Sequence, residues 1–389
     1  MRIVTVLTSL GVGGAEKQAL AVAKRMVKRG HEVAVLVLRA QLPQEWPTAL
    51  PVVHLDIYGV RENPVSLAAG FVRGRRFLHD FRPDVVHSHS FHANLLARML
   101  QIGAAIRTAN GGRCAAVIST VHNVYEGGWM RMMAYRLTDG LSDCTVAVSQ
   151  AAAERFVGLK AIPKHKYLVR VNGIDGAEFA PDTERRARMR SEMLGTEATN
   201  RAFVWLSAGR VTPAKDFPNL LRAFALVRKE APGAELWIAG ALNDAKEAVA
   251  ADGVADDVRD AETDGQEGVR WLGLRRDMPA LIDAADGFVL ASAWEGMPLV
   301  IGEAMAMEKP VVATDVGGVR ELVGDCGAIV PAKNTGALAA AMLRTMRQSR
   351  EERAQRGRMA RERIVREFSI DAAADWWEKT YRQGIANRE

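Results

Sequence analysis

The chain has 389 residues, which is too long for one hydrophobic core and predicts two domains of ordinary size. Apolar residues make up 48% and charged residues 25%, as in a globular protein, and no segment approaches the roughly 20 apolar residues of a transmembrane helix. The net charge of +6 is unevenly distributed, because residues 1–178 carry +9 and the remainder −3. The basic first half could bind an anionic substrate or an anionic membrane surface, or its charges could simply be solvated.

The first half alternates between strands and helices. Residues 3–7 predict a strand, the three glycines between positions 11 and 14 a loop, and residues 15–29 a helix. Further strands are predicted at 31–38, 84–89, 115–122 and 143–149. This alternation predicts βαβ units in a parallel sheet.

The same pattern restarts near residue 202. Residues 202–209 predict a strand, 217–230 a helix and 235–241 a second strand. Four more strands are expected at 269–273, 287–292, 311–314 and 327–330. The restart predicts a second, similar α/β domain, with domains at 1–178 and 179–370.

Three other stretches have charge patterns that set them apart. A charged helical stretch at 182–195 marks the domain boundary. Residues 242–267 carry nine acidic and two basic residues and are interpreted as a surface insertion. Residues 344–366 contain nine arginines, for which a solvated helix face is the preferred interpretation.

The glycine loop is incomplete as a dinucleotide-binding fingerprint. Glu16 stands where the pattern that begins Gly11-x-Gly13 requires Gly or Ala, so a simple NAD site is disfavoured. The close glycines still permit a backbone approach to a ligand. The scattered cysteines, Cys114, Cys144 and Cys326, argue against a disulfide framework and favour a reducing, cytoplasmic compartment.

The strongest local signal follows the strand at 287–292. Ligands bind beyond the carboxyl ends of strands in open α/β sheets. Gly296 permits a close approach of the backbone, and Pro298 suits the first turn of a helix that runs from about Leu299 to Met307. The first N–H groups of such a helix form an anion site, which predicts a bound phosphate.

Two carboxylates flank this helix start. Glu295 and Glu303 can each accept hydrogen bonds from sugar hydroxyls, Glu295 from a transferred sugar and Glu303 from a ribose. The alternative is that Glu295 caps the helix and Glu303 lies on a solvated face. For an isolated pair of glutamates, this alternative is the better one.

Basic residues mark a second loop. Arg210 and Lys215 lie between a predicted strand end and a helix that starts near Pro218, and both suit phosphate oxygens. The loop is not a P-loop, because GxxxxGK[ST] is absent.

Histidines gather in the first half. His87, His89 and His92 lie close together in the sequence, and His122 ends a strand. No cysteine or further ligand set supports a closed zinc site, so we expect no metal. The three clustered histidines are expected at an acceptor cleft or a helix N-terminus.

Taken together, these segments resemble the GT-B retaining glycosyltransferases of the family 4 (group 1) type, over almost the whole chain. In the first half, the loop Gly13–Glu16 resembles the family's first loop, and Thr120–Asn123 resembles the segment with its active-site histidine. Residues 146–156 and 171–175 resemble the segments before the linker. The family's C-terminal helix, here about 371–389, crosses back onto the first domain.

In the second half, Arg210 and Lys215 match the family's diphosphate-binding pair, and Glu295 and Glu303 match its paired glutamates. The chain departs from the pattern at Asp216, where the family often has Gly. The resemblance reverses the preference between the two interpretations of the glutamates. It implies that the catalytic residues are His122, Glu295, Arg210 and Lys215.

The resemblance also assigns the remaining site residues. The donor-binding set is Gly13, Gly14, Gly273, Gly296, Met297, Pro298, Leu299, Val300 and Glu303. The acceptor-side candidates are Glu16, His89 and Asn123. The first domain is expected to bind the acceptor and the second the nucleotide sugar.

The implied function is retaining transfer of a sugar, a hexose by expectation, from a UDP- or GDP-sugar to an acceptor hydroxyl, without a metal or cofactor. A glycan or lipid-linked acceptor is expected, in the assembly of cell-surface polysaccharide or glycolipid. The segment 127–137 mixes aromatic, Met and Arg residues and suits peripheral contact with an anionic membrane at the cytoplasmic face of the inner membrane, or an ordinary packed helix.

Two other functions stay open at this stage. A sugar-nucleotide epimerase uses the same two-domain architecture, although the glutamate pair and the Arg/Lys loop favour transfer. A nucleic-acid-binding protein is suggested only by the isoelectric point of 9.3, and the sequence contains no recognisable nucleic-acid-binding module.

Overall fold

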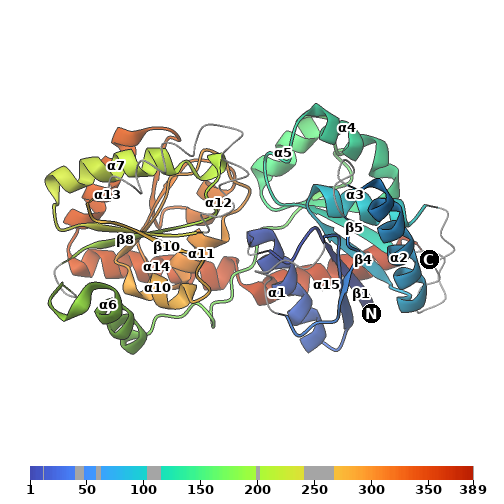
Figure 1. Ribbon diagram of the computed structural model, residues 1–389, viewed down its shortest axis with the longest axis horizontal. Coiled ribbons are helices and arrows are strands. Elements are labelled where there is room, and N and C mark those ends of the chain that lie inside the picture. The colour runs from blue at the N-terminus through green and yellow to red at the C-terminus, as the bar shows by residue number, and fades with distance from the viewer. Residues whose placement is uncertain are drawn as a thin grey trace. The chain divides into compact units, whose positions relative to one another are not determined.

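The computed structural model describes residues 1–11, 13–39, 48–57, 63–102, 115–198, 202–240 and 267–388. Cys114 and the acidic stretch at 242–266 lie outside these residues. The chain divides into two compact units (Figure 1). The first comprises Met1–Gly173 and Ile370–Glu389, and the second Ile174–Ser369. The observed boundary follows Gly173, slightly before the boundary that was predicted after residue 178.

The first unit is built on a parallel sheet of seven strands in the order β3-β2-β1-β4-β5-β6-β7. The strands are β1 (Arg2–Leu7), β2 (Glu32–Val37), β3 (Val52–His54), β4 (Val85–His89), β5 (Ala116–Val121), β6 (Cys144–Ala147) and β7 (Tyr167–Val169). The central strands are buried on both faces, which explains their continuous runs of Val, Ile and Leu.

Helices cover both faces of this sheet (Figure 1). One face carries α1 (Gly14–Lys28) and the C-terminal helix α15 (Ile370–Ala386), whose Trp377 and Tyr381 join a core with Val22 and Met26. The other face carries α2 (Pro64–Phe81) and α3 (Phe91–Leu100). The described part of this unit also contains α4 (Trp129–Thr138), η1 (Asp139–Leu141) and α5 (Gln150–Gly158).

The second unit repeats the design with six parallel strands in the order β10-β9-β8-β11-β12-β13. The strands are β8 (Val204–Ala208), β9 (Glu235–Ala239), β10 (Val269–Gly273), β11 (Gly287–Leu290), β12 (Val311–Thr314) and β13 (Ala328–Val330). Because β8 pairs directly with β11, the loops that follow these two strands meet at the same edge of the sheet.

Helices also lie on both faces of the second sheet (Figure 1). α7 (Phe217–Glu230) and α13 (Thr335–Arg347) pack together in one core. α10 (Met278–Ala284), α11 (Leu299–Ala306) and α14 (Arg350–Glu367) lie towards the other face, where α6 (Thr183–Ala198) packs on α10. The short helices η2 (Pro213–Lys215) and α12 (Val319–Val323) follow β8 and β12. The predicted α/β class with two parallel sheets is confirmed.

The structure differs from the sequence-based expectations in two respects. The edge strands β3 and β7 were not predicted, because each is three residues long and neither contains a fully buried residue. The arginine-rich helix is not simply a solvated face. Arg361 donates hydrogen bonds to the backbone carbonyls of Phe179 and Ala306, and Arg363 binds that of Leu322, so both arginines hold neighbouring segments in place.

Candidate functional site

An ion pair joins the two loops at the carboxyl edge of the second sheet. Lys215 Nζ lies 2.5 Å from Glu295 Oε1, and Ser292 Oγ donates a 2.7 Å hydrogen bond to the same oxygen. The side chains of Lys215 and Glu295 are only 18% and 11% exposed. Lys215 follows β8 and Glu295 follows β11, so the parallel pairing of these strands brings the two residues together across 80 positions of sequence.

Hydrogen bonds connect the loop that carries Lys215 to its neighbours on both sides. The Ala293 N–H donates to the Ala214 carbonyl at 2.8 Å, which ties this loop to the one after β11. Asp216 adopts a left-handed conformation with φ of 46°, and its side chain accepts a hydrogen bond from the Asn219 N–H at the start of α7. Asp tolerates this conformation better than most residues, so it can replace the glycine expected there without changing the turn.

The start of α11 is shaped by a glycine turn that packs against it. Gly317 has φ of 54°, and a Cβ atom there would collide with the Glu295 carbonyl. The next residue, Gly318, donates its N–H to the Gly296 carbonyl at 2.7 Å. Pro298 occupies the N-cap position with φ of −74° and ψ of 108°, so it stands just before the helix and not in its first turn as predicted.

Both alternative interpretations of the glutamates are wrong. Glu295 is not the N-cap of α11, because Pro298 occupies that position. Glu303 does not lie on a solvated face, because it is 4% exposed on a helix that is buried over most of its surface. Burial of a carboxylate is costly, so a specific role for each glutamate is the better explanation.

The other donor-side residues occupy the same edge of the sheet. Gly296, Met297, Pro298 and Leu299 are buried, and Val300 is half-buried. Gly273 is the last residue of β10. Arg210 is exposed in the loop after β8, and it makes no ion pair or hydrogen bond with any residue that the structure describes.

In the first unit, two histidines meet at the carboxyl ends of β4 and β5. Nδ1 of His89, the last residue of β4, lies 3.0 Å from Nε2 of His122, which follows β5. The ring of His89 also contacts that of His87, whose nitrogens share hydrogen bonds with Thr120 and with Tyr381 of the C-terminal helix. His92 lies apart from this contact, exposed in the first turn of α3, and a helix N-terminus is one of the two places expected for these histidines. The described residues include no group of three or more His, Cys, Asp or Glu arranged to hold a metal ion.

Glu126 is a buried residue of this region that the sequence analysis did not identify. Its Oε1 accepts a 3.0 Å hydrogen bond from the His122 backbone N–H, and its Oε2 accepts a 2.6 Å bond from the Tyr135 hydroxyl. Asn94 in turn donates to the Tyr135 oxygen at 3.0 Å. A glutamate four positions after His122 has no distinctive sequence context, so only the folded chain reveals the contact.

Burial shifts the ionisation of this cluster away from the charged forms. It lowers the pKa of His87 to about 3 and that of His122 to about 4, and it lowers the pKa of His89 well below its usual value. Burial raises the pKa of Glu126 to about 7, against the opposing effect of its hydrogen bonds from Tyr135 and His122. All three histidine rings are therefore neutral at pH 7.

The remaining candidates of the first unit are the donor-side Gly13 and Gly14 and the acceptor-side Glu16, all at the start of α1, and the acceptor-side Asn123, in the loop after β5. Gly13 is the N-cap of α1, and the Glu16 side chain folds back so closely over Gly13 that a Cβ atom there would collide with it. Asn123 follows His122, and its side chain accepts a 3.3 Å hydrogen bond from the Tyr125 N–H. The Asn123 side chain therefore stabilises a local turn.

Two family models match most of the chain. Residues 12–178 match Glycosyltransferase Family 4, and residues 202–348 match Glycosyl transferases group 1. The chain belongs to this glycosyltransferase family. The first match falls largely in the first structural unit and the second match falls in the second unit. The resemblance inferred from the motifs is therefore confirmed.

Curated relatives of this glycosyltransferase are distant in sequence. It is 26% identical over 247 residues to the Escherichia coli UDP-Gal:alpha-D-GlcNAc-diphosphoundecaprenol alpha-1,3-galactosyltransferase, covering 60% of this chain and 58% of the relative. It is 29% identical over 310 residues to glycogen synthase of Mycobacterium tuberculosis, covering 76% and 67% of the two chains. The chain thus spans about three fifths to two thirds of the length of these relatives.

A solved structure supports the fold over nearly the whole chain. The structure of HepE from Anabaena in complex with UDP and glucose has a TM-score of 0.81 and 20% identity, and the match covers 98% of this chain and 99% of that one. The predicted GT-B arrangement of two Rossmann-like domains is confirmed as the fold class. Among the described residues, no helix has an apolar stretch long enough to cross a membrane.

The neutral state of the buried histidines can be measured by NMR. We expect the ring resonances of His87 and His122 to show no titration between pH 7 and pH 5, because burial disfavours the imidazolium forms. An unfolded chain would take up these protons near pH 6.5, so the free energy of unfolding should fall as the pH drops from about 6.5 towards 4. Spectra of His87→Gln and His122→Asn assign the signals, and titration of either ring near pH 6.5 would contradict the burial argument.

Proposed function

We propose that this chain transfers a hexose from a UDP- or GDP-sugar to a hydroxyl of a glycan or lipid-linked acceptor, with retention of anomeric configuration and without a metal. The observation that carries the proposal is the Lys215–Glu295 pair, which places a cation and a carboxylate next to the N-terminus of α11. A sugar diphosphate needs this combination, because its phosphates require positive charge and its sugar hydroxyls require acceptors.

On the donor side, the developing charge of the departing diphosphate is stabilised by Lys215, Arg210 and the first N–H groups of α11. Arg210 is available for this role, since none of the described residues pairs with it. Glu295 accepts hydrogen bonds from the transferred sugar, and Glu303 from the ribose. Gly273 and the backbone from Gly296 to Val300 complete the donor site on the second unit. Gly13 and Gly14 are proposed as further donor-binding residues.

On the acceptor side, a neutral His122 can donate or accept a hydrogen bond at the reacting sugar. We assign Glu126 as the residue that positions His122, because its carboxylate binds the His122 backbone N–H and is itself held by Tyr135. His89 sets the ring orientation of His122 through their shared hydrogen bond. Glu16 and Asn123 are further acceptor-side candidates. Attack of the acceptor hydroxyl on the same face as the leaving diphosphate gives retention without a covalent intermediate.

Known relatives guide the choice of substrates. The Anabaena protein binds UDP-glucose in a solved complex, and the Escherichia coli relative uses UDP-Gal with a lipid diphosphate acceptor, as its name states. These relatives support testing UDP-hexoses first and a lipid-linked saccharide as the first acceptor.

Removal of either member of the ion pair tests the proposal. Glu295→Gln and Lys215→Met should each lower kcat/KM for transfer by about 100-fold or more. Lys215→Met removes the cation that stabilises the departing diphosphate, and Glu295→Gln removes the charged acceptor of the sugar hydroxyls. Lys229→Ala removes an exposed cation from α7 and is the matched control. Circular dichroism checks that each variant folds.

The same assay distinguishes transfer from the epimerase alternative. NMR of the product should show the anomeric configuration of the donor, and turnover should require an acceptor. Inversion at the anomeric carbon would contradict the retaining mechanism. Release of a new nucleotide sugar without an acceptor would identify an epimerase, and wild-type turnover in Glu295→Gln would remove that residue from the site.

The exposed side of α4 supports the proposed membrane contact. Trp129 and Leu137 are 74% and 77% exposed, and Met130 and Met133 are exposed beside them. Large exposed apolar side chains with a nearby arginine, here Arg136, are typical of helices that lie in a membrane interface. The opposite side of α4 supplies Tyr135, which binds Glu126. A helix docked on the cytoplasmic face of the inner membrane would therefore bring lipid-linked acceptors close to His122.

Vesicle flotation tests this contact. At low salt, wild-type protein should float with vesicles that contain anionic phospholipid, and added salt should weaken the binding. The double variant Trp129→Ser/Leu137→Ser should stay in solution, whereas Val65→Ser, an equally exposed position on α2, should float like wild type. Equal flotation of the double variant and wild type, or no flotation of either, would contradict a membrane role for α4.

A further inference from the structure

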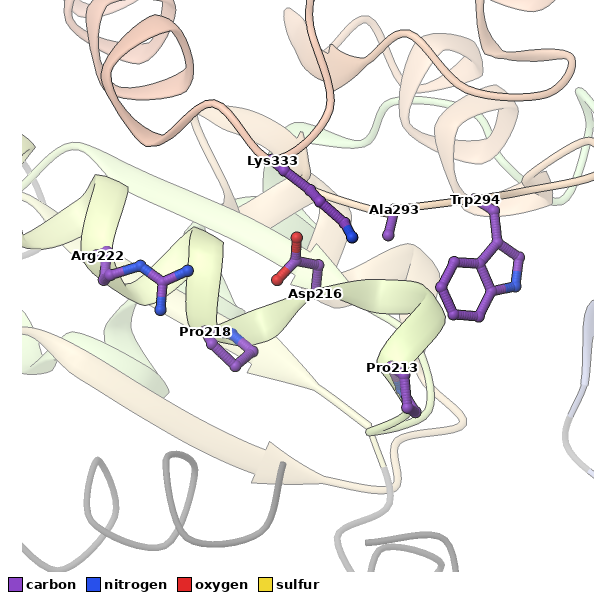
Figure 2. A pocket seen from close by; sticks show the side chains of 7 residues that line it. All are labelled: Pro213, Asp216, Pro218, Arg222, Ala293, Trp294 and Lys333. Atoms are coloured by element: carbon purple, nitrogen blue, oxygen red, sulfur yellow. The ribbon is translucent and has the colours of Figure 1, made fainter. Parts of the chain in front are cut away.

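The second unit contains a pocket of about 340 Å³ beside the loops that carry Lys215 and Glu295 (Figure 2). Its lining comes from the loops after β8, β11 and β13 and from the first turns of α7, so it opens at the carboxyl edge of the sheet. The side chains that matter chemically are Pro213, Pro218, Trp294, Asp216, Arg222 and Lys333. None of these residues belongs to the donor or acceptor sets assigned above.

We propose that this pocket binds a neutral saccharide unit of the glycan substrate, other than the sugar that is transferred. The inference rests on the proposed glycosyltransferase function, and it names an extended saccharide as the substrate class. It also places a saccharide-binding site on the second unit, whereas the acceptor-side candidates all lie on the first.

The lining has the mixture of groups that a sugar ring needs. The indole of Trp294 and the ring of Pro213 lie at one end of the pocket and offer apolar surfaces for sugar C–H groups (Figure 2). The Asp216 carboxylate can accept hydrogen bonds from hydroxyls, and Lys333 and Arg222 can donate them. Neither Lys333 nor Arg222 makes an ion pair or hydrogen bond with another described residue, so their donors are available to a ligand.

A phosphate or another anion fits this pocket less well than a neutral sugar. Lys333 and Asp216 both line the pocket, so a ligand there meets a carboxylate as well as an ammonium group (Figure 2). The carboxylate would repel an anion placed between them. Asp216 also binds the Asn219 N–H at the start of α7, so this N–H is not available to an incoming anion. A saccharide uses the acceptor and the two cations together, because each hydroxyl is both a donor and an acceptor.

The size and the backbone of the pocket agree with a small, specific ligand. Its volume lies at the small end of the roughly 300–1,000 Å³ range of ligand pockets, which suits a short piece of glycan. Asp216 and Lys333 both have left-handed backbones, with φ of 46° and 56°. Such conformations in non-glycine residues are uncommon and cluster at ligand sites, where they fix the direction of a side chain.

The pocket is connected to the candidate donor site through two short segments. Trp294 immediately precedes Glu295, and Pro213 begins the short helix η2 that ends at Lys215. The hydrogen bond from Ala293 to Ala214 joins these segments between the two sites. A saccharide held by Trp294 and Pro213 would therefore be bound close to the ion pair without using either of its residues.

Saturation-transfer NMR with a panel of neutral gluco-, galacto- and manno-oligosaccharides tests the proposal. At least one should bind saturably to the full chain, and Lys333→Ala/Arg222→Ala should raise its dissociation constant by about tenfold, as loss of charged hydrogen bonds predicts. Lys229→Ala, the matched control on α7, should bind like wild type. Saturating UDP should leave the binding intact, because the pocket is separate from the donor site.

Four outcomes would overturn the proposal. They are no binding by any saccharide of the panel, unchanged affinity in the double variant, displacement by UDP, and displacement by inorganic phosphate, which would indicate an anion site. A failure of the proposed glycosyltransferase function is distinguishable from these outcomes. In that case, wild-type protein would transfer no sugar from any donor tested, whatever the saccharide-binding experiment shows.

Discussion

The candidate donor site depends on one ion pair between two loops of the second unit. The Glu295 carboxylate is largely removed from solvent, and it is stabilised there by Lys215 and the Ser292 hydroxyl. Loss of one partner from a buried pair costs about 3 kcal/mol or more, so each residue requires the other. The pair exists because β8 and β11 are adjacent and parallel, which places their following loops at the same edge.

Other features of the second unit serve to hold that pair in place. The glycine turn at Gly317 packs on the Glu295 backbone, and Asp216 starts α7 directly after Lys215. Similar constraints act in the first unit, where the ends of β4 and β5 bring His89 and His122 together and Glu126 fixes the backbone of His122. Each unit thus presents its candidate site residues at or beyond the carboxyl ends of its strands and supports them with buried polar contacts.

The parallel-sheet architecture could be predicted because buried strands have continuous apolar sequences and alternate with helices. The edge strands β3 and β7 could not be predicted, since short, half-exposed strands lack continuous apolar sequences. The roles of Glu295 and Glu303 were ambiguous for a different reason. The partner of Glu295 is 80 residues away, and the burial of Glu303 depends on the packing of α11. Local sequence contains neither fact, and the family resemblance changed the preferred interpretation of the two glutamates without predicting either fact. Glu126 and the pocket beside Trp294 depend on tertiary contacts in the same way.

The most direct test of the central claim is calorimetric titration of the protein with UDP and GDP, with uridine and guanosine as phosphate-free controls. If Lys215 and Glu295 form a sugar-nucleotide site, wild-type protein should bind one diphosphate much more tightly than its nucleoside. Lys215→Met should lose most of this difference, because the cation that contacts the phosphates is absent. Equal binding of the diphosphate by wild type and Lys215→Met would contradict the account.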